Sequence, residues 1–424
     1  MKEELLHFIW KFKLKAGQQL QTLTGESINI VHSGVENNSD GPDFLNARVK
    51  IGNEEWIGNV EIHINSSDWY KHKHSDNPKY KNIILHVVYF EDKEVEELTY
   101  QKIPTLELKG KLSLKLIDQY KNLMTNRKWI PCQDEIKTVD DFIINSWLDR
   151  LLIERIERKT EFVQSIFENS GFDWNQTFFE VLCRGFGFKK NAEGFNTLAN
   201  RIGFTAFQKE KELSSENIEA LFLGTAGFLP EVSNHFYIQK LCRLFAYQKS
   251  KYGIEVMESK LWIKGAVRPA NQPFVRIIQL INFLISIDRP LLEIIGTQIL
   301  TEISSGLKMN SIGYWKSHDR IEQPKVNGIK SMGDKSVDGI LINSILPFQF
   351  FYAKWIKDEN LMNKSIDLFE GIRPEENTIV KSWESIGVKA VSAGKTQSLI
   401  ELKNSYCSEK KCLFCSIGSK ILKT

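Results

Sequence analysis

Residues 41–64 read GPDFLNARVKIGNEEWIGNVEIHI, and this stretch decides the fold of the first part of the chain. Apolar and polar residues alternate over 44–51 and again over 56–64, which is the pattern of half-buried β-strands. The Gly52-Asn53 pair between them is typical of a tight turn. The sequence therefore predicts a β-hairpin centred on Gly52.

Two carboxylates accompany this hairpin. Asp43 precedes the first strand, and Glu61 lies inside the second. Residues equidistant from a hairpin turn lie side by side, so we expect both carboxylates within reach of one cation. Carboxylate oxygens on rigid strands suit Mg²⁺ or Mn²⁺. Asp43 and Glu61 are thus candidate ligands of a divalent metal.

The flanking segments extend the prediction. A helix is predicted over 3–13, because Leu5, Ile9 and Phe12 fall on one face. Further strands are predicted over 27–32, 83–90 and 104–108. We expect this α/β unit to end near Lys111, a usual length for a domain.

From residue 112 the apolar residues recur at helical spacing. The pattern predicts a long amphipathic helix from about 142 to 156, and six further apolar blocks at 178–186, 218–223, 237–247, 275–287, 291–303 and 339–354. The fold class expected is α+β. It comprises an α/β domain over 1–111, an α-helical domain over 112–400 and a cysteine-rich tail over 401–424 that packs back on the domain junction.

Composition sets limits on the class of protein. The chain has 424 residues, 42% of them hydrophobic, which is ample for two or three domains. A net charge of +3 neither demands nor excludes a nucleic-acid partner. No apolar run approaches the ~20 residues of a membrane span. The first residues lack the pattern of a secretory signal, so we expect a cytoplasmic protein without membrane association.

The order helix, strand, hairpin, strand, with Pro42-Asp43 followed by Glu61-Ile62-His63, resembles the PD-(D/E)XK nuclease superfamily and its αβββαβ core. The resemblance implies that Asp43 and Glu61 bind the metal. His63 stands where that superfamily has a lysine that assists the attacking water, so the pattern departs at this position. A neutral imidazole there can orient or deprotonate water, but it lacks a permanent charge.

Two further likenesses concern shorter motifs. The Ser66-Ser67 pair is similar to that of resolvase-type members of the superfamily, which implies contact with nucleic acid. The chain as a whole resembles a bacterial family known as domain of unknown function 2851. The motifs that carry this likeness are Gly41-Pro42-Asp43-Phe44, Val60-Glu61-Ile62-His63, Ser67-Asp68-Trp69, Arg268-Pro269-Ala270-Asn271 and the terminal cysteines. This second likeness implies no particular activity.

Cys407, Cys412 and Cys415 form a Cys-x4-Cys-x2-Cys motif in a basic, polar tail. Three thiolates at this spacing repel one another unless a metal neutralises them, and Cys132 is the candidate for a fourth ligand. The set is similar to the iron–sulfur site of some PD-(D/E)XK nucleases of the recombination and CRISPR-adaptation families, although the tail spacing differs. The resemblance implies a [4Fe-4S] cluster; Zn²⁺ and free thiols are the alternatives.

Other polar clusters have two interpretations each. Arg184, Lys189 and Lys190 lie among glycines and aromatic residues and are candidates for phosphate contacts; the alternative is a helix connection with solvated cations. His72 and His74 have the spacing of a possible chelate. We expect them to form an exposed pair on a loop rather than a zinc site.

Three functions remain open from the sequence. The first is a Mg²⁺-dependent nuclease, with DNA rather than RNA as its substrate and with Asp43, Glu61 and His63 as catalytic residues. The second is an inactive nuclease fold that binds nucleic acid or a protein partner. The third is a structural scaffold. The sequence does not indicate the oligomeric state.

Overall fold

The structure is a computed structural model that describes residues 2–12, 14, 20–37, 39–288, 290–295, 299–311, 313–326 and 328–423. It divides into two compact units, one comprising Met1–Trp147 with Leu402–Thr424 and the other Leu148–Glu401. The first unit thus extends beyond the boundary expected at residue 111. It also includes Leu402–Thr424, most of the segment that the sequence predicted as a tail packing back on the domain junction.

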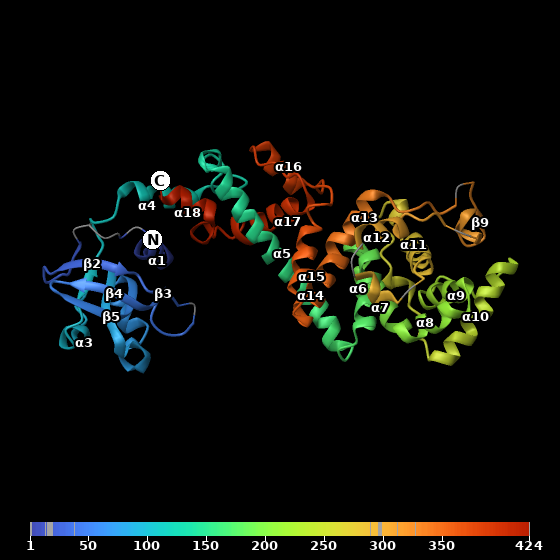
Figure 1. The fold of residues 1–424 in the computed structure, drawn as a ribbon, viewed down its shortest axis with the longest axis horizontal. Helices are drawn as coiled ribbons and strands as arrows, with labels where there is room; N and C mark the ends of the chain where they lie inside the picture. Colours follow the sequence, from blue (N-terminus) through green and yellow to red (C-terminus); the bar gives the residue numbers. More distant parts are fainter. Residues whose placement is uncertain are drawn as a thin grey trace. The chain divides into compact units, whose positions relative to one another are not determined.

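A mixed sheet forms the centre of the first unit, in the order β1-β2-β4-β5-β6-β7, with β3 also paired to β4. Its strands are β1 (Leu20–Gln21), β2 (Ser27–His32), β3 (Val35–Glu36), β4 (Phe44–Ile51), β5 (Glu54–Asn65), β6 (Ile83–Phe90) and β7 (Thr105–Glu107). Strands β1 to β5 pair antiparallel, whereas β6 and β7 run parallel to their neighbours. Figure 1 shows β2, β4 and β5 side by side.

The β4–β5 hairpin has an irregular register that matters for the site. Ala47 pairs with Gly58, but Phe44 pairs with Val60, so three residues along β4 match two along β5. This is a β-bulge, and Asn46 inside it has a left-handed backbone with φ 55°. Carried one residue further, the shifted register places Asp43 opposite Glu61.

Helices cover the sheet and complete the first unit. Helix α1 (Glu3–Phe12) buries its apolar face, including Leu5 and Ile9, and packs against β5. The last residue of the predicted helix, Lys13, lies outside the described residues. Helices α2 (Asp68–Lys71), α3 (Glu96–Tyr100) and α4 (Leu114–Thr125) follow along the chain. The C-terminal helix α18 (Ser416–Lys423) lies beside α4 (Figure 1).

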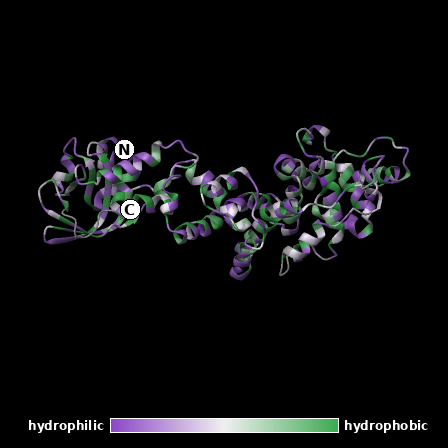
Figure 2. Ribbon diagram, turned by 90° about the horizontal axis from the view of Figure 1, so that it is seen from above, coloured by the Kyte–Doolittle hydropathy of each residue, from purple (hydrophilic) through white to green (hydrophobic). Residues whose placement is uncertain are grey.

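In the described residues of the second unit the regular structure is helical, apart from the short strands β8 (His318–Arg320) and β9 (Gln323–Pro324). Its α-helices are α5 (Asp141–Asn169), α6 (Trp174–Phe186), α7 (Phe188–Ile202), α8 (Phe204–Leu213), α9 (Ser215–Thr225), α10 (Phe236–Tyr252), α11 (Pro273–Ser286), α12 (Ile299–Leu307), α13 (Asp334–Ile340), α14 (Leu346–Ile356), α15 (Glu359–Asp367), α16 (Thr378–Ser385) and α17 (Ala393–Glu401). Figure 2 shows hydrophobic and hydrophilic residues alternating along these helices, as expected of helices around an apolar core. A sheet-containing N-terminal part followed by a helical region is what the sequence predicted.

One buried carboxylate stands out in the core of the second unit. Glu219 of α9 accepts hydrogen bonds from the Tyr237 hydroxyl at 2.8 Å and from the Trp315 indole at 2.5 Å. Burial outweighs these two bonds and raises the pKa of Glu219 to about 7. No described helix is long and apolar enough to cross a membrane.

Candidate metal centre

Asp43 and Glu61 meet where β4 begins. The backbone N–H of Asp43 donates to Glu61 Oε2 at 3.1 Å, and the backbone N–H of Ile62 donates to Asp43 Oδ2 at 2.8 Å. The Glu61 carboxylate therefore holds the backbone of Asp43, and the Asp43 carboxylate holds the backbone of Ile62, beside Glu61. Helix α1 adds His7, whose Nε2 lies 3.4 Å from Asp43 Oδ2. The hairpin thus brings together the two residues that the sequence singled out.

His63 follows Glu61 by two residues on β5, so both side chains lie on the same face of the strand. His63 Nε2 lies 3.5 Å from Glu61 Oε1, 3.2 Å from His72 Nδ1 and 3.3 Å from His74 Nε2. Its other nitrogen, Nδ1, lies 2.9 Å from His86 Nε2 on the parallel strand β6. His63 is therefore the centre of an imidazole cluster.

The loop after β5 turns two more histidines toward this centre. His72 ends the short helix α2, and His74 begins the next helical turn. Lys73 between them has a left-handed backbone with φ 58°, which is uncommon for a residue with a side chain. The expectation of an exposed pair is wrong for His74, which is buried; His72 is exposed. One ligand nitrogen from each of His63, His72 and His74 lies within 4.8 Å of the other two.

Aromatic packing fixes the orientation of these rings. Trp69 meets His63, His74 and His86 edge to face, with ring centroids 5.2 to 6.4 Å apart. Tyr80 stacks on His74 at a centroid distance of 3.9 Å. Rings held on several sides keep their nitrogens in place, as preorganised ligands must.

Burial determines the protonation of the cluster. It lowers the pKa of His63 to about 2, helped by the neighbouring imidazoles, and lowers the pKa of His86 to about 3. Burial and the charge of Asp43 raise the pKa of Glu61 to about 9. The buried imidazoles are therefore neutral at pH 7, the form in which histidine binds a metal, and a metal must displace the Glu61 proton.

The serines after β5 are engaged within the first unit. Ser66 Oγ donates to Asp92 Oδ1 at 3.1 Å and accepts from the Lys93 backbone N–H at the same distance. Ser67 Oγ donates to Asp92 Oδ2 at 2.7 Å. These bonds join the end of β5 to the loop that follows β6.

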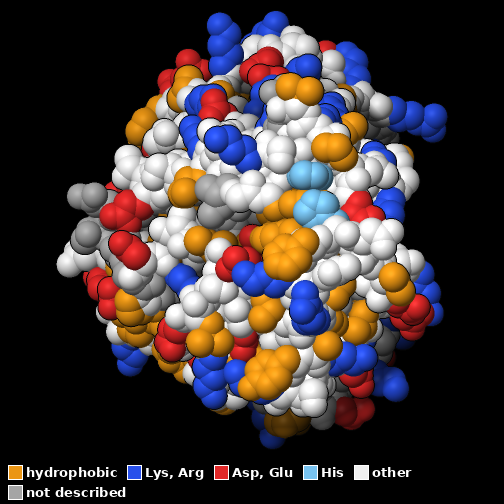
Figure 3. Space-filling model, turned by 90° about the vertical axis from the view of Figure 1, so that its right-hand side faces the viewer, with side chains coloured by type: hydrophobic (Ala, Val, Ile, Leu, Met, Phe, Trp, Pro, Cys, Tyr) orange, Lys and Arg blue, Asp and Glu red, His pale blue; other side chains and the backbone are white. Residues whose placement is uncertain are grey.

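The basic residues at the α6–α7 junction lie in the second unit. Arg184 pairs with Glu193 at 2.6 Å, and Lys190 donates to the Ala266 carbonyl at 2.7 Å, while Lys189 is exposed. On the face drawn in Figure 3, the lysine and arginine side chains are interspersed with aspartate and glutamate. Arg184 and Lys190 thus have partners that explain their positions within a helix connection.

Four of the six cysteines belong to the first unit, and all six are free thiols. Cys132, Cys412 and Cys415 are buried, and Cys407 is half-buried. Burial raises the pKa of all four thiols, and among neighbouring charges that of Cys415 contributes most for the other three. The thiols from distant parts of the chain therefore lie near one another.

The sulfur of Cys415 has its own set of donors. The backbone N–H groups of Ile417 and Gly418 lower the pKa of this thiol, which partly offsets the effect of burial. Gly418 has no room for a Cβ atom, because the carbonyl of Cys412 occupies that space. Among the described residues, no three cysteine sulfurs lie within 4.8 Å of one another.

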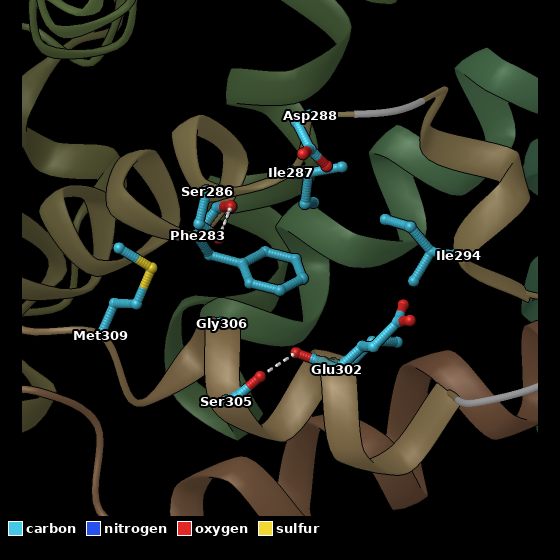
Figure 4. Close-up of a pocket in the computed structure, with 10 residues that line it drawn as sticks. Phe283, Ser286, Ile287, Asp288, Ile294, Glu302, Ser305, Gly306 and Met309 are labelled. Atoms are coloured by element: carbon cyan, nitrogen blue, oxygen red, sulfur yellow. Dashed lines mark hydrogen bonds between the residues drawn. The ribbon is translucent and has the colours of Figure 1, made fainter.

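The second unit also contains a cavity of about 340 Å³ between α11 and α12. Figure 4 shows the ring of Phe283 at its centre, with Met309 to one side and Glu302 to the other. The described lining residues include neither histidine nor cysteine. The cavity thus lacks the nitrogen and sulfur ligands found in the first unit.

Sequence reasoning gave Asp43, Glu61 and His63, but it missed the contribution of His7 and the convergence of His72, His74 and His86. A signal was available, since four of the eight histidines of the chain fall within residues 63–86. No curated protein and no solved structure matches the chain. A family model, that of the "Protein of unknown function (DUF2851)", matches residues 3–378, which include the whole histidine and carboxylate cluster but not the terminal cysteines. The chain therefore belongs to this family.

Proposed function

We propose that the first unit is a divalent-metal-dependent phosphodiesterase that cuts nucleic acid, with DNA rather than RNA as its substrate. The observation that carries the proposal is the pairing of Asp43 with Glu61 beside the imidazoles of His63 and His74. Two carboxylates and two neutral imidazoles, held by the β4–β5 hairpin and the turn that follows β5, are a donor set that fits a divalent cation.

The order of elements supports the nuclease class within hydrolases. Helix α1, the antiparallel strands β2, β4 and β5, and the parallel strand β6 follow the αβββαβ order of the PD-(D/E)XK core that the sequence resembles. Asp43 lies at the start of the middle strand and Glu61 inside the next, as in that pattern. The proposal extends this likeness to the fold family and to its chemistry.

Each residue of the site has its own role in this proposal. Asp43 and Glu61 hold the cation, which when bound supplies an activated water and neutralises charge on the phosphate. The Ile62 and Asp43 backbone N–H groups fix the two carboxylates, so that their oxygens need not reorganise. His63 Nε2 lies 3.5 Å from Glu61 Oε1, whereas the Asp43 backbone N–H binds the other oxygen, Oε2. His72, the exposed member, leaves the cluster open to solvent on one side.

An assay of the full chain tests this proposal. Purified protein with Mg²⁺ or Mn²⁺ is expected to cut end-labelled single-stranded or duplex DNA, and Asp43→Asn and Glu61→Gln are expected to abolish cutting. Asp40→Asn is the matched control, since Asp40 is an exposed carboxylate three residues away that pairs with Lys79. Cutting by both site variants at the rate of the parent would assign the activity to a contaminant. Binding of DNA without cutting would favour the inactive nuclease fold.

We also propose a cofactor at Cys132, Cys407, Cys412 and Cys415. A single zinc ion with sulfur at about 2.3 Å requires sulfurs roughly 3.8 Å apart. The thiols of the described structure influence one another without any three approaching within 4.8 Å. This wider arrangement favours an iron–sulfur cluster over zinc, and N–H donors to Cys415 are typical of the surroundings of such sulfurs.

A further inference from the structure

We infer that His63, His72 and His74 form a binding site for a transition-metal cation, with Zn²⁺ the best fit, rather than a site for Mg²⁺. The inference concerns the class of metal. Only its catalytic consequence rests on the proposed function, because metal binding can be measured without any substrate.

The spacing of the nitrogens is the first argument. His63 Nε2 lies 3.2 Å from His72 Nδ1 and 3.3 Å from His74 Nε2. In a tetrahedral site with metal–nitrogen bonds of about 2.0–2.1 Å, neighbouring nitrogens are about 3.3 Å apart. Two of the three nitrogen pairs are thus already at the separation that a shared cation requires, and the third pair lies within 4.8 Å.

Hydrogen bonding alone does not account for this crowding. With its proton on Nδ1, facing His86, a neutral His63 has a single lone pair at Nε2, which cannot accept well-aligned hydrogen bonds from both His72 and His74. At most one of these two nitrogen pairs is then a well-aligned hydrogen bond, so the other close contact gains little from hydrogen bonding in a buried site. A cation among the nitrogens converts the same contacts into favourable ones.

Glu61 and His86 complete the site in two different ways. Glu61 Oε1 lies 3.0 Å from His74 Nε2 and 3.5 Å from His63 Nε2, where it can supply an oxygen ligand. His86 is a positioning residue, because its Nε2 lies 2.9 Å from His63 Nδ1 and can accept a hydrogen bond from that N–H. This bond leaves the lone pair of His63 Nε2 directed at the metal, the usual arrangement for metal-binding histidines.

The choice of metal follows from the ligands. Imidazole nitrogen suits Zn²⁺ and its neighbours in the transition series, whereas Mg²⁺ prefers oxygen and retains several waters. Three imidazoles with one carboxylate therefore disfavour Mg²⁺ at this position. Exposure of His72 provides a route by which the cation enters.

The test uses the full chain stripped of metal and titrated with Co²⁺ and then Zn²⁺. Wild-type protein is expected to gain a visible Co²⁺ absorption band that Zn²⁺ displaces and that a large excess of Mg²⁺ does not. His72→Ala is expected to weaken Co²⁺ binding at least 100-fold without unfolding the chain, because His72 is exposed. His32→Ala, which changes an exposed histidine of the same unit, is the matched control. Cys415→Ala separates this band from any cobalt bound by the cysteines.

Two results would overturn the inference. One is a wild-type chain that gains no such band, and the other is a His72→Ala variant that binds Co²⁺ as the parent does. Asp43→Asn separates this inference from the proposed function, since it is expected to keep the cobalt band while losing DNA cutting. A wild-type chain with an intact band and no cutting would refute the nuclease proposal alone.

Discussion

The backbone N–H of Asp43 donates to the carboxylate of Glu61, so that each of these residues depends on the other for its position. In turn, the Asp43 carboxylate accepts a hydrogen bond from the backbone N–H of Ile62, the residue after Glu61. A substitution at either residue therefore changes both charge and local structure. Variants that keep the hydrogen bond can separate the two effects.

Asp43→Asn is expected to lower DNA cutting by at least about 100-fold with little change in stability, since a ligand charge is lost while an oxygen acceptor remains for the Ile62 N–H. Asp43→Ala is expected to lose activity and also about 1–3 kcal/mol of unfolding free energy, because that N–H is left without its acceptor. Initial cutting rates and urea unfolding of the three proteins measure this. Equal stability of the two variants would show that the bond contributes nothing.

His86→Phe is expected to weaken Co²⁺ binding by about 10–100-fold, the usual effect of removing the partner of a metal-binding histidine. The ring of His86 is fully buried, and phenylalanine fills its space without a nitrogen to face His63 Nδ1. His86→Gln, which restores a side-chain acceptor, is expected to recover part of the affinity. Competition with a metal indicator of known affinity measures both variants. An unchanged affinity in His86→Phe would remove the positioning role.

Cys132→Ser is expected to lower the iron or zinc content of anaerobically purified protein and to lower the stability of the first unit. Metal bound by folded thiols contributes directly to folding free energy, so the loss exceeds that of removing a surface thiol. Elemental analysis and the absorption spectrum identify the metal. Cys242→Ser in the second unit is the control, and its metal content should equal that of the parent. A parent that contains neither iron nor zinc would refute the cofactor proposal.

Glu219 is expected to make the second unit less stable as the pH rises. The folded state raises the pKa of this carboxyl from 4.5 to about 7. At pH values between these two, the folded protein holds a proton that the unfolded chain releases. The associated stabilisation is complete below about pH 4.5 and declines as the pH approaches 7. Each pKa unit corresponds to about 1.4 kcal/mol, so the change is on the order of 3 kcal/mol.

Glu219→Gln keeps an oxygen for Tyr237 and Trp315 but carries no charge at any pH. It is therefore expected to flatten the pH dependence of stability and to be more stable than the parent at pH 8. Denaturant unfolding of both proteins from pH 4.5 to 8 measures the difference. Glu216→Gln, which changes a more exposed neighbour paired with Lys240, should follow the parent curve.

Much of the sheet was predictable because strand patterning is local. The strands over 27–32, 44–51 and 83–90 were predicted with the bounds that the structure has. Two strands were missed, β1 (Leu20–Gln21) and β3 (Val35–Glu36), because a two-residue strand is too short to show alternation. The domain boundary was harder, since the packing of residues 402–424 with the first unit is a long-range contact.

The site was predictable only where it follows from the hairpin. Asp43 and Glu61 are related by strand pairing, which a sequence pattern can express. His72 and His74 are related to His63 by a left-handed turn at Lys73, and nothing in their spacing fixes that backbone. Packing by Trp69, from the preceding helix, then decides which way the rings point. The turn and the packing are both tertiary effects, so the alternation pattern that predicted the strands could not predict them.

The bulge at Asn46 has a consequence for how such a site is inherited. Because three residues of β4 match two of β5 there, the alignment of Asp43 with Glu61 depends on how many residues separate Asp43 from the turn, whatever their identity. With the bulge retained, removing one residue between Asp43 and the turn would place Asp43 opposite Val60 instead, on the other face of the strand. Two relatives could therefore carry the same acids and histidines and yet differ in metal binding, because one of them lacks a single residue of β4.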